Sequence, residues 1–322
     1  MLQVKVNLKD TGYNITIGNR ILENCGATLK DFAKSVGIGQ DAVIITNPII
    51  KQRHGRALSS TLKGHDFSVK FFEVPSGEPS KSAQCAFDVI EKIAAYSVGR
   101  KIFIIAFGGG VVGDLSGFVA AVYRRGIPYI QIPTTLLAQI DSAIGGKVGI
   151  DLPSGKNLVG AFYQPLLVWS DVHVLSTLDE RQLRNGLAEA VKYGAICDKG
   201  LFDYIENNLK KIFALEPKVI REVVYQCSRI KAKVVMSDER ETRGIRTILN
   251  FGHTVGHAIE AANQYQDYHH GEAVALGMRV AAEISHQMGF LNSEHQDRLG
   301  KLLSAIGLPA RSRSTRRCSE WN

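Results

Sequence analysis

The residues best suited to chemistry in this chain are one glutamate and three histidines in three separate segments. Glu189 lies in Gly-Leu-Ala-Glu-Ala-Val-Lys, His253 and His257 lie in Gly-His-Thr-Val-Gly-His, and His270 precedes Gly-Glu. Two imidazoles and one carboxylate can bind a divalent metal and leave a tetrahedral ion one open position, as in catalytic zinc sites. We therefore predict a catalytic metal site, and the spacing alone leaves open which two imidazoles take part.

The two nearer histidines lie four residues apart, so on a helix they share one face. Such a pair alone is more often hydrogen-bonded or solvated than metal-bound. Gly252 and Gly256 each weaken a helix by about 1 kcal/mol relative to alanine. Glycine at these positions therefore indicates that another part of the molecule approaches the backbone closely. Thr254 stands where the His-Glu-x-x-His motif has its general base, so zinc peptidase chemistry is disfavoured.

Composition places the chain among ordinary globular proteins. Its 322 residues suit one large or two ordinary domains, and 45% apolar with 22% charged residues is typical. No apolar run is long enough to span a membrane, and the polar start is unlike a signal peptide. The five scattered cysteines lack Cys-x-x-Cys spacing, which indicates reduced thiols in a cytoplasmic protein.

The net charge of +8 does not indicate a nucleic-acid surface. Four arginines gather in the last dozen residues, and the other basic residues that stand out lie singly inside glycine-rich or apolar motifs. We therefore predict a pocket for an anionic small molecule, with no nucleic-acid and no membrane partner.

The first half of the chain predicts alternating strands and helices. Apolar runs predict strands at 41–46, 68–74, 101–107 and 129–132, and helical spacing predicts helices at 48–64, 80–96 and 111–123. An opening hairpin is expected from segments 4–8 and 13–17 around Asp10-Thr11-Gly12. This alternation is typical of a parallel sheet with helices on both faces.

Beyond about residue 180 only helices are predicted, at 180–193, 199–208, 216–238, 253–261, 271–288 and 293–306. The expected fold class is an α/β N-terminal domain with a Rossmann-like parallel sheet, followed by an all-α C-terminal domain. We place the first domain at 1–175 and the second at 176–322. All candidate metal ligands then belong to the second domain.

A glycine-rich turn joins one predicted strand to the next helix. Strand 101–107 runs into Gly-Gly-Gly-Val-Val-Gly-Asp, which contains Gly-x-Gly-x-x-Gly and would let a pyrophosphate lie at a helix N-terminus. The acidic residue that usually closes the next strand is absent, so a standard Rossmann site is not expected. We predict a nucleotide phosphate here, and a tight turn that binds nothing is the alternative.

A series of motifs resembles the 3-dehydroquinate synthase family. In the first half they are Phe107–Asp114, Tyr-Arg-Arg-Gly-Ile at 123–127, Pro-Thr-Thr-Leu-Leu-Ala-Gln-Ile-Asp-Ser at 133–142, Gly-Gly-Lys at 145–147 and Gly-Lys-Asn at 155–157. In the second half they are Ala-Glu-Ala-Val-Lys at 188–192, Leu-Asn-Phe-Gly-His at 249–253 and His-Gly-Glu at 270–272. They keep their order and spacing over most of the chain.

The resemblance implies a two-domain fold related to glycerol and iron-dependent alcohol dehydrogenases, with bound NAD and a zinc or cobalt ion. Domain 1–175 would bind NAD, and domain 176–322 would bind the metal and the substrate. Matching motif positions makes Glu189, His253 and His270 the metal ligands, with His257 facing the substrate. We also expect a homodimer.

The resemblance implies two further sets of contact residues. The dinucleotide would contact Glu78, Lys81, Gly109, Gly110, Val111, Gly113, Asp114, Thr134, Thr135, Asp141, Lys147 and Lys156. The substrate, a sugar acid phosphate, would contact Arg125, Lys147, Asn157, Lys192, Lys231, Arg246, Asn250 and His257. A ligand with both a carboxylate and a phosphate needs several fixed cations, whereas the alternative for each basic residue is a solvated surface charge.

The reaction implied by the resemblance converts 3-deoxy-D-arabino-heptulosonate 7-phosphate into 3-dehydroquinate and phosphate, in the shikimate pathway. Oxidation at C5 acidifies the neighbouring C–H, phosphate is eliminated, and the hydride returns from NADH. Ring opening and an intramolecular aldol step then close the carbocycle, so NAD is regenerated. The metal would polarise the hydroxyl that is oxidised, and the protein would mainly orient groups and place charges.

Other interpretations remain open at this stage. Another sugar phosphate cyclase, acting on sedoheptulose 7-phosphate or an amino analogue, would share NAD and metal without needing a substrate carboxylate. A metal-dependent polyol dehydrogenase would accumulate NADH. An inactive homologue that serves as a binding protein is the third alternative.

The end of the chain differs from the rest. Residues 310–322 have no apolar period and no helix caps, and they do not match the helices with which family members continue. We expect a truncated or frameshifted end that leaves apolar faces of helices 271–288 and 293–306 partly exposed and weakens activity.

Overall fold

The computed structural model describes residues 1–9, 11–263 and 267–312, which form two compact units. The first unit is Met1–Asp179 with Lys210–Ile245, and the second is Glu180–Leu209 with the described residues from Arg246 onward. Segment 210–245 therefore groups with the first unit, whereas the sequence analysis placed it with the second domain. The division into domains 1–175 and 176–322 stays a prediction.

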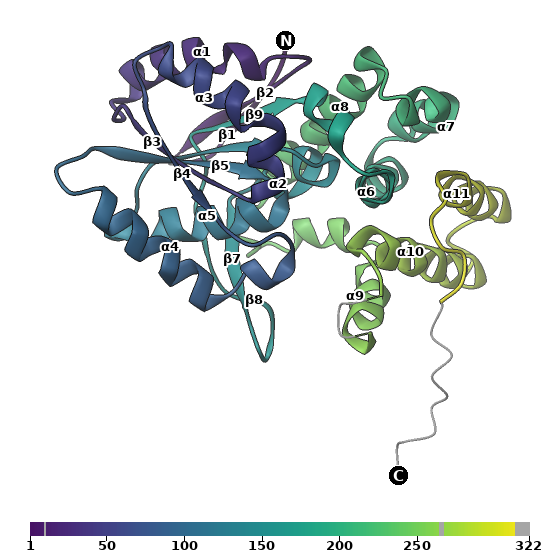
Figure 1. Ribbon diagram of the computed structural model, residues 1–322. Coiled ribbons are helices and arrows are strands. Elements are labelled where there is room, and N and C mark those ends of the chain that lie inside the picture. The colour runs from purple at the N-terminus through teal and green to yellow at the C-terminus, as the bar shows by residue number, and fades with distance from the viewer. Residues whose placement is uncertain (10, 264–266, 313–322) are drawn as a thin grey trace. The chain divides into compact units, whose positions relative to one another are not determined.

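The first unit is built on one sheet, with strand order β1-β2-β9-β6-β5-β3-β4 among the described residues (Figure 1). Its strands are β1 (Leu2–Asn7), β2 (Gly12–Gly18), β3 (Asp41–Thr46), β4 (Ser68–Glu73), β5 (Ile102–Gly108), β6 (Tyr129–Pro133) and β9 (Leu167–Asp171). β1 and β2 form an antiparallel hairpin, and the other neighbours pair in parallel. The expected hairpin and parallel sheet are confirmed, although Asp10 of the predicted turn lies outside the described residues.

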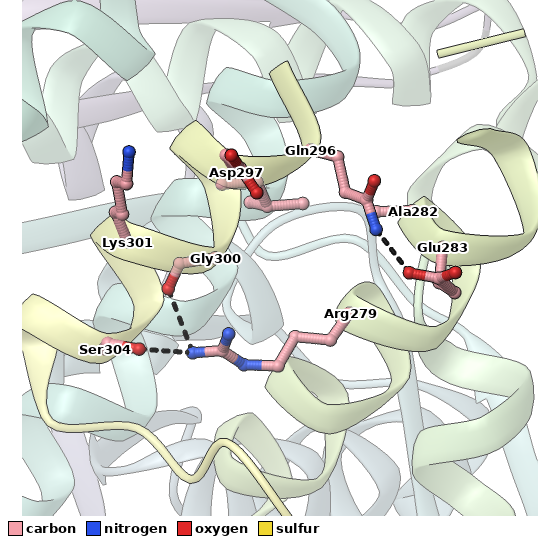
Figure 2. Close-up of a pocket in the computed structure, with 9 residues that line it drawn as sticks. Arg279, Ala282, Glu283, Gln296, Asp297, Gly300, Lys301 and Ser304 are labelled. Atoms are coloured by element: carbon pink, nitrogen blue, oxygen red, sulfur yellow. Dashed lines mark hydrogen bonds between the residues drawn. The ribbon is translucent and has the colours of Figure 1, made fainter. Parts of the chain in front are cut away.

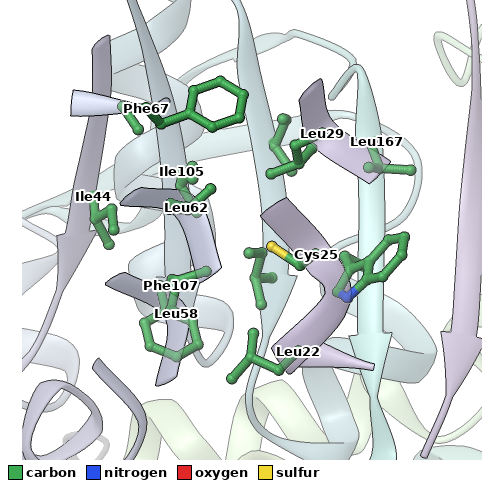
Figure 3. Close-up of a cluster of buried hydrophobic side chains, with 14 of the residues drawn as sticks. Leu22, Cys25, Leu29, Ile44, Leu58, Leu62, Phe67, Ile105, Phe107 and Leu167 are labelled. Atoms are coloured by element: carbon green, nitrogen blue, oxygen red, sulfur yellow. The ribbon is translucent and has the colours of Figure 1, made fainter. Parts of the chain in front are cut away.

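Helices cover both faces of this sheet, because successive strand residues point to opposite sides. Ile44 and Ile105 face α1 (Cys25–Val36) and α3 (Arg56–Lys63), where they pack in one buried apolar cluster with Cys25, Leu58 and neighbouring side chains (Figure 3). Alternate strand residues such as Ile45 pack in a second cluster with α4 (Ala83–Tyr96) and α5 (Gly110–Val122). Burial on both sides explains why the strands read as continuous apolar runs.

Several elements differ from the sequence prediction. The predicted helix 48–64 consists of α2 (Pro48–Ile50), a π-helical turn at Lys51–Gly55 and α3. The strands β7 (Lys147–Leu152), β8 (Gly155–Phe162) and β9 were missed. The residues of β8 are mostly exposed, so they lack an apolar alternation. β9 has five residues and ends in Ser170 and Asp171, so it is too short to identify by periodicity. β7 and β8 form a separate antiparallel hairpin that packs by β7 against α5.

The later half of the chain is helical, as expected. Its helices are α6 (Glu180–Cys197), α7 (Lys199–Phe213), α8 (Pro217–Ser237), α9 (His253–Ala262), α10 (His270–Gln287) and α11 (Ser293–Ile306). α8 belongs to the first unit because it packs on β1 and on the turn 138–142. The predicted fold class, an α/β part followed by an all-α part, is confirmed.

α10 and α11 are joined by polar side chains along a groove of about 520 Å³ (Figure 2). Arg279 on α10 donates to Gly300 O at 3.1 Å and Ser304 Oγ at 2.9 Å on α11, and Gln296 donates to Glu283. Of the described residues that line this groove, none is a predicted site residue.

The apolar exposure expected for the two last helices occurs on one of them. Val280, Ile284 and Met288, on or just after α10, are 41%, 50% and 62% exposed, whereas the leucines and the isoleucine of α11 are buried. The part of that expectation that concerns residues 313–322 lies outside the described residues. Within the described ranges, no helix is long and apolar enough to cross a membrane.

Candidate active site

Three helices of the second unit bring Glu189, His253 and His270 together. Glu189 lies on α6, while His253 and His270 are the first residues of α9 and α10. One possible ligand atom of each lies within 4.8 Å of the other two, with Nε2 of His253 at 3.6 Å and Nε2 of His270 at 3.7 Å from Glu189 Oε1. The predicted ligands are thus adjacent in space, and their role as ligands remains a proposal.

The surroundings of His253 favour its neutral imidazole form. Burial lowers the pKa of His253. The Glu189 carboxylate raises this pKa in part, and the charge of Lys192 lowers it further. Neutral imidazole is the form that binds a metal. Lys192, predicted to contact substrate, is buried and forms an ion pair with Glu189, so it lies at the cluster itself.

Glycines beside the histidines allow the helices to approach closely. An added Cβ at Gly277 on α10 would lie 1.8 Å from the carbonyl oxygen of Gly252, which has a φ of +80° at the start of α9. A Cβ at Gly256 would lie 3.2 Å from Val274 atoms on α10. The close backbone approach expected from Gly252 and Gly256 is confirmed, and the neighbouring backbone belongs to α10.

Gly271 fixes the start of α10 against α6. A Cβ there would lie 2.2 Å from Asn185 O, and the Gly271 N–H donates to Asn185 Oδ1 at 2.5 Å. The His270 ring is therefore held relative to Glu189, four residues after Asn185 on α6.

We expect Gly271→Ala to lower the free energy of unfolding by about 1–3 kcal/mol, because the methyl group forces backbone apart in a packed interior. It should also weaken metal binding, since α10 carries His270. Denaturant unfolding and metal titration measure the two effects. Gly200→Ala, at an exposed position of α7, is the matched control and should be neutral or stabilising. Unchanged stability and metal affinity in Gly271→Ala would contradict the close contact.

Three other predicted substrate residues belong to the same part of the chain. The ring of His257 is exposed and lies 5.3 Å from that of His253 and 5.9 Å from that of His270, measured between centroids. Arg246 is buried and Asn250 exposed on the 3₁₀ turn Ile245–Asn250 that precedes α9. The ring of His257 thus lies beside two of the three proposed ligands.

One residue of this region was missed by the sequence analysis. Glu260 on α9 lies with a carboxylate oxygen 3.1 Å from His270 Nδ1, and it is only 6% exposed. Glu260, His257 and His270 also form a second set of possible ligands within 4.8 Å of one another. The available signal was the spacing, because positions 253, 257 and 260 share one face of a helix.

The glycine-rich turn lies at the carboxyl edge of the parallel sheet, where β5 ends beside β6. Added Cβ atoms at Gly109, Gly110 and Gly113 would each lie 2.9 Å from a side-chain atom, of Thr135, Ser142 and Gln131 respectively. Packing within the chain therefore accounts for these glycines. Contact of a nucleotide phosphate with Gly109, Gly110, Val111 and Gly113 remains a proposal.

Five of the predicted site residues line one cavity of about 540 Å³ in the first unit. They are Asp114, Asp141, Lys147, Asn157 and Lys231, and Glu241 lines the cavity with them. Lys231 Nζ lies 2.5 Å from Asp141 Oδ1, and Lys147 Nζ lies 2.6 Å from Glu241 Oε1. Two lysines directed to one cavity fit the predicted anionic ligand.

The buried side chain of Lys81 bonds to two residues that line this cavity. Lys81 Nζ lies 2.6 Å from Asp114 Oδ2 and also donates to Asn157 Oδ1. Burial raises the pKa of Asp114 to about 6, in spite of the neighbouring Lys81. Burial would lower the pKa of Lys81, but its pairing with Asp114 raises it overall. Asn157 has a φ of +58° and donates its N–H to Asp151 Oδ1, which fixes its side chain toward Lys81.

The raised pKa predicts a pH-dependent stability. Since Asp114 titrates near pH 6 when folded and near its usual 3.8 when unfolded, its contribution is fully present below about pH 4. It is lost as pH rises through 6, by about 3 kcal/mol. Urea unfolding of wild type and Asp114→Asn between pH 4 and 8 should show this dependence only in wild type. Asp88→Asn, at an exposed position, should retain it, and an identical pH profile for Asp114→Asn would contradict the assignment.

The remaining predicted residues of the first unit do not line this cavity among the described residues. Arg125 is exposed and has a φ of +64°, and Thr134 is buried beside Gly108. Thr135 Oγ1 accepts from the backbone of Ala138. Glu78 and Lys156 pair with each other at 3.3 Å. Their contacts with a dinucleotide stay predictions.

Solved structures of two synthases share this fold and are about 30% identical to this chain. A 2-epi-5-epi-valiolone synthase from Streptomyces hygroscopicus, solved with NAD⁺ and Zn²⁺, has a TM-score of 0.86 and 29% identity over 95% of this chain and 84% of that one. A 2-deoxy-scyllo-inosose synthase, solved with carbaglucose-6-phosphate, NAD⁺ and Co²⁺, has a TM-score of 0.86 and 30% identity over 97% and 84%. This likeness in fold and sequence places the chain among the sugar phosphate cyclases.

Sequence comparison identifies the family within this class of enzymes. Family models described as the N-terminal and C-terminal parts of 3-dehydroquinate synthase match residues 71–185 and 186–320. The 3-dehydroquinate synthase of Desulforamulus reducens is 45% identical over 95% of this chain and 84% of its own length, and that of Thermoanaerobacter pseudethanolicus is 43% identical over 95% and 85%. The chain belongs to the 3-dehydroquinate synthase family.

Proposed function

We propose that this chain converts 3-deoxy-D-arabino-heptulosonate 7-phosphate into 3-dehydroquinate and phosphate, with a divalent ion and with NAD that is recycled. The observation that supports this most is the 42–45% identity to 3-dehydroquinate synthases over about 95% of the chain. The solved cyclases with other names are only 29–30% identical. These identities therefore favour 3-dehydroquinate synthase activity over that of another sugar phosphate cyclase.

The donor set of the second unit fits a divalent ion. Glu189, His253 and His270 offer one carboxylate and two imidazoles within 4.8 Å, and these types of ligand suit zinc or cobalt. When bound, the ion would supply Lewis acidity to a substrate hydroxyl, and NAD would supply hydride acceptance and return. Lys192 would balance the charge of Glu189 and present its ammonium group to the substrate.

The first unit offers cations for the acidic groups of the substrate. Lys231 is 9% exposed, and its side chain is held by Asp141 at the wall of the cavity. Lys147 is more exposed and could follow a ligand as it binds. Lys81 and Asp114 would hold the dinucleotide side of this cavity, with Asn157 of β8 fixed by its hydrogen bonds to Lys81 and to Asp151 of β7. These residues bind and orient, which is the larger part of the catalysis required of the protein.

The proposal is tested by phosphate release. Purified protein with zinc or cobalt, heptulosonate phosphate and NAD at a hundredth of the substrate concentration should release phosphate over many turnovers. Absorbance at 340 nm should show no net rise, because the hydride returns to the substrate. Omitting NAD, or removing metal with a chelator, should abolish release.

Two outcomes would contradict the proposal. Stoichiometric NADH formation, with glycerol or another polyol, would identify a dehydrogenase. Turnover of sedoheptulose 7-phosphate with no turnover of the heptulosonate would identify another cyclase, since that substrate lacks the carboxylate.

The same proposal includes a homodimer in the cytoplasm. It is supported only by the family membership and by the scattered cysteines without disulfide spacing. Analytical ultracentrifugation of the purified chain tests the dimer, and a single monomeric species at micromolar concentration would contradict it.

A further inference from the structure

We propose that Glu260 positions His270 for the divalent ion by accepting the proton on Nδ1. The inference rests on the proposed function, because it concerns the same metal. Glu260 is not one of the three residues that would bind the ion, and it acts through His270. Its side chain and that of Glu189 approach opposite nitrogens of one imidazole ring.

The two nitrogens of His270 face different carboxylates. Nδ1 lies 3.1 Å from Glu260 Oε2, within hydrogen-bond distance, whereas Nε2 lies 3.7 Å from Glu189 Oε1. A neutral imidazole carries one N–H, and a carboxylate can only accept. The proton therefore belongs on Nδ1, facing Glu260. The lone pair of Nε2 is then directed to the side of Glu189 and His253, as an ion bound there requires.

The position of Glu260 is fixed by the backbone. Its side chain is 7% exposed, and it lies on α9, which contacts α10 through Gly256 and Gly277 with no room for a Cβ. His270 is the first residue of α10. The hydrogen bond thus joins two helices whose separation cannot vary freely, and the ring orientation of His270 is set before an ion binds.

The same residues allow one competing arrangement. Glu260, His257 and His270 could themselves hold an ion, and the nitrogen of His270 nearest to Glu260 is Nδ1. The two arrangements use His270 in opposite tautomers, so they exclude each other at one ring. The burial of Glu189 and its position beside both His253 and His270 favour the first, since His257 is exposed.

Metal titration of the full chain distinguishes these arrangements. Metal-free wild type, Glu260→Gln, Glu189→Gln and Glu283→Gln are titrated with Zn²⁺ against a chromophoric chelator, and with Co²⁺ by visible absorption. We expect Glu260→Gln to bind one ion with about 10–100-fold weaker affinity and an unchanged pattern of Co²⁺ bands. Glu189→Gln should change the bands, and Glu283→Gln, an exposed position on α10, should match wild type.

Three other results would each overturn a stated part of the proposal. Equal affinity of Glu260→Gln and wild type would overturn the positioning role while leaving the metal site intact. Loss of Co²⁺ bands in Glu260→Gln, with retention in Glu189→Gln, would make Glu260 a ligand and would also overturn it. A wild type that binds no divalent ion would instead refute the metal site of the proposed function.

A second measurement covers the case in which Glu260→Gln fails to fold. Long-range nitrogen–proton NMR spectra of ¹⁵N-histidine-labelled, metal-free wild type report the tautomer of each ring, with His270→Ala used for assignment. We expect His270 to carry its proton on Nδ1. A proton on Nε2 of His270 would overturn the proposal without any variant at position 260.

Discussion

Replacing His270 with alanine is expected to give a folded protein that retains little divalent metal and has lost activity by about a thousand-fold or more. A Lewis acid supplies several kcal/mol to such a step, and each 1.4 kcal/mol is tenfold in rate. Among the three proposed ligands, His270 has the most exposed side chain, at 31% against 13% for His253 and 0% for Glu189. Its removal therefore disturbs the interior least.

Elemental analysis after dialysis and the phosphate-release assay measure these effects. Glu260 loses a hydrogen-bond partner in this variant, so a cost of about 1–3 kcal/mol in the free energy of unfolding is also expected. His295→Ala is the matched control, because this histidine on α11 is exposed and is not one of the proposed ligands. Full metal occupancy in His270→Ala would show that another residue completes the site.

The second large effect is expected from Lys231→Met, which removes a buried cation from the wall of the cavity in the first unit. A charge-assisted contact to a phosphate or carboxylate is worth about 1.5–3 kcal/mol. The value of kcat/KM should therefore fall roughly 10- to 150-fold. Methionine preserves most of the apolar stem, so the loss reports the charge and not the packing.

Lys233→Met on the same helix is the control, since Lys233 is exposed. Its kcat/KM should equal that of wild type. Lys231 also pairs with Asp141, so a purely structural role is the competing explanation. That role would lower the melting temperature of Lys231→Met and leave kcat/KM unchanged, which would remove Lys231 from the proposed substrate contacts.

Much of the fold was determined by local sequence patterns. The strand Asp41–Thr46 and the helix Ser293–Ile306 were predicted with their observed bounds, because a buried parallel strand is continuously apolar and an amphipathic helix repeats every 3.6 residues. β7 and β8 were missed, since a largely exposed hairpin with glycines has neither pattern. The grouping of α8 with the first unit depends on contacts with β1, which lies more than 200 residues earlier and leaves no local trace.

The sequence by itself determined the chemical inventory: a carboxylate and imidazoles in small-residue segments, lysines in glycine- and asparagine-rich motifs, and the family they resemble. Only the tertiary structure decided which groups meet. It directed Lys231 and Lys147 to one cavity and brought Glu260 to the far side of His270. These contacts join residues of different helices or strands, and they depend on how closely the backbones pack, which no local spacing specifies.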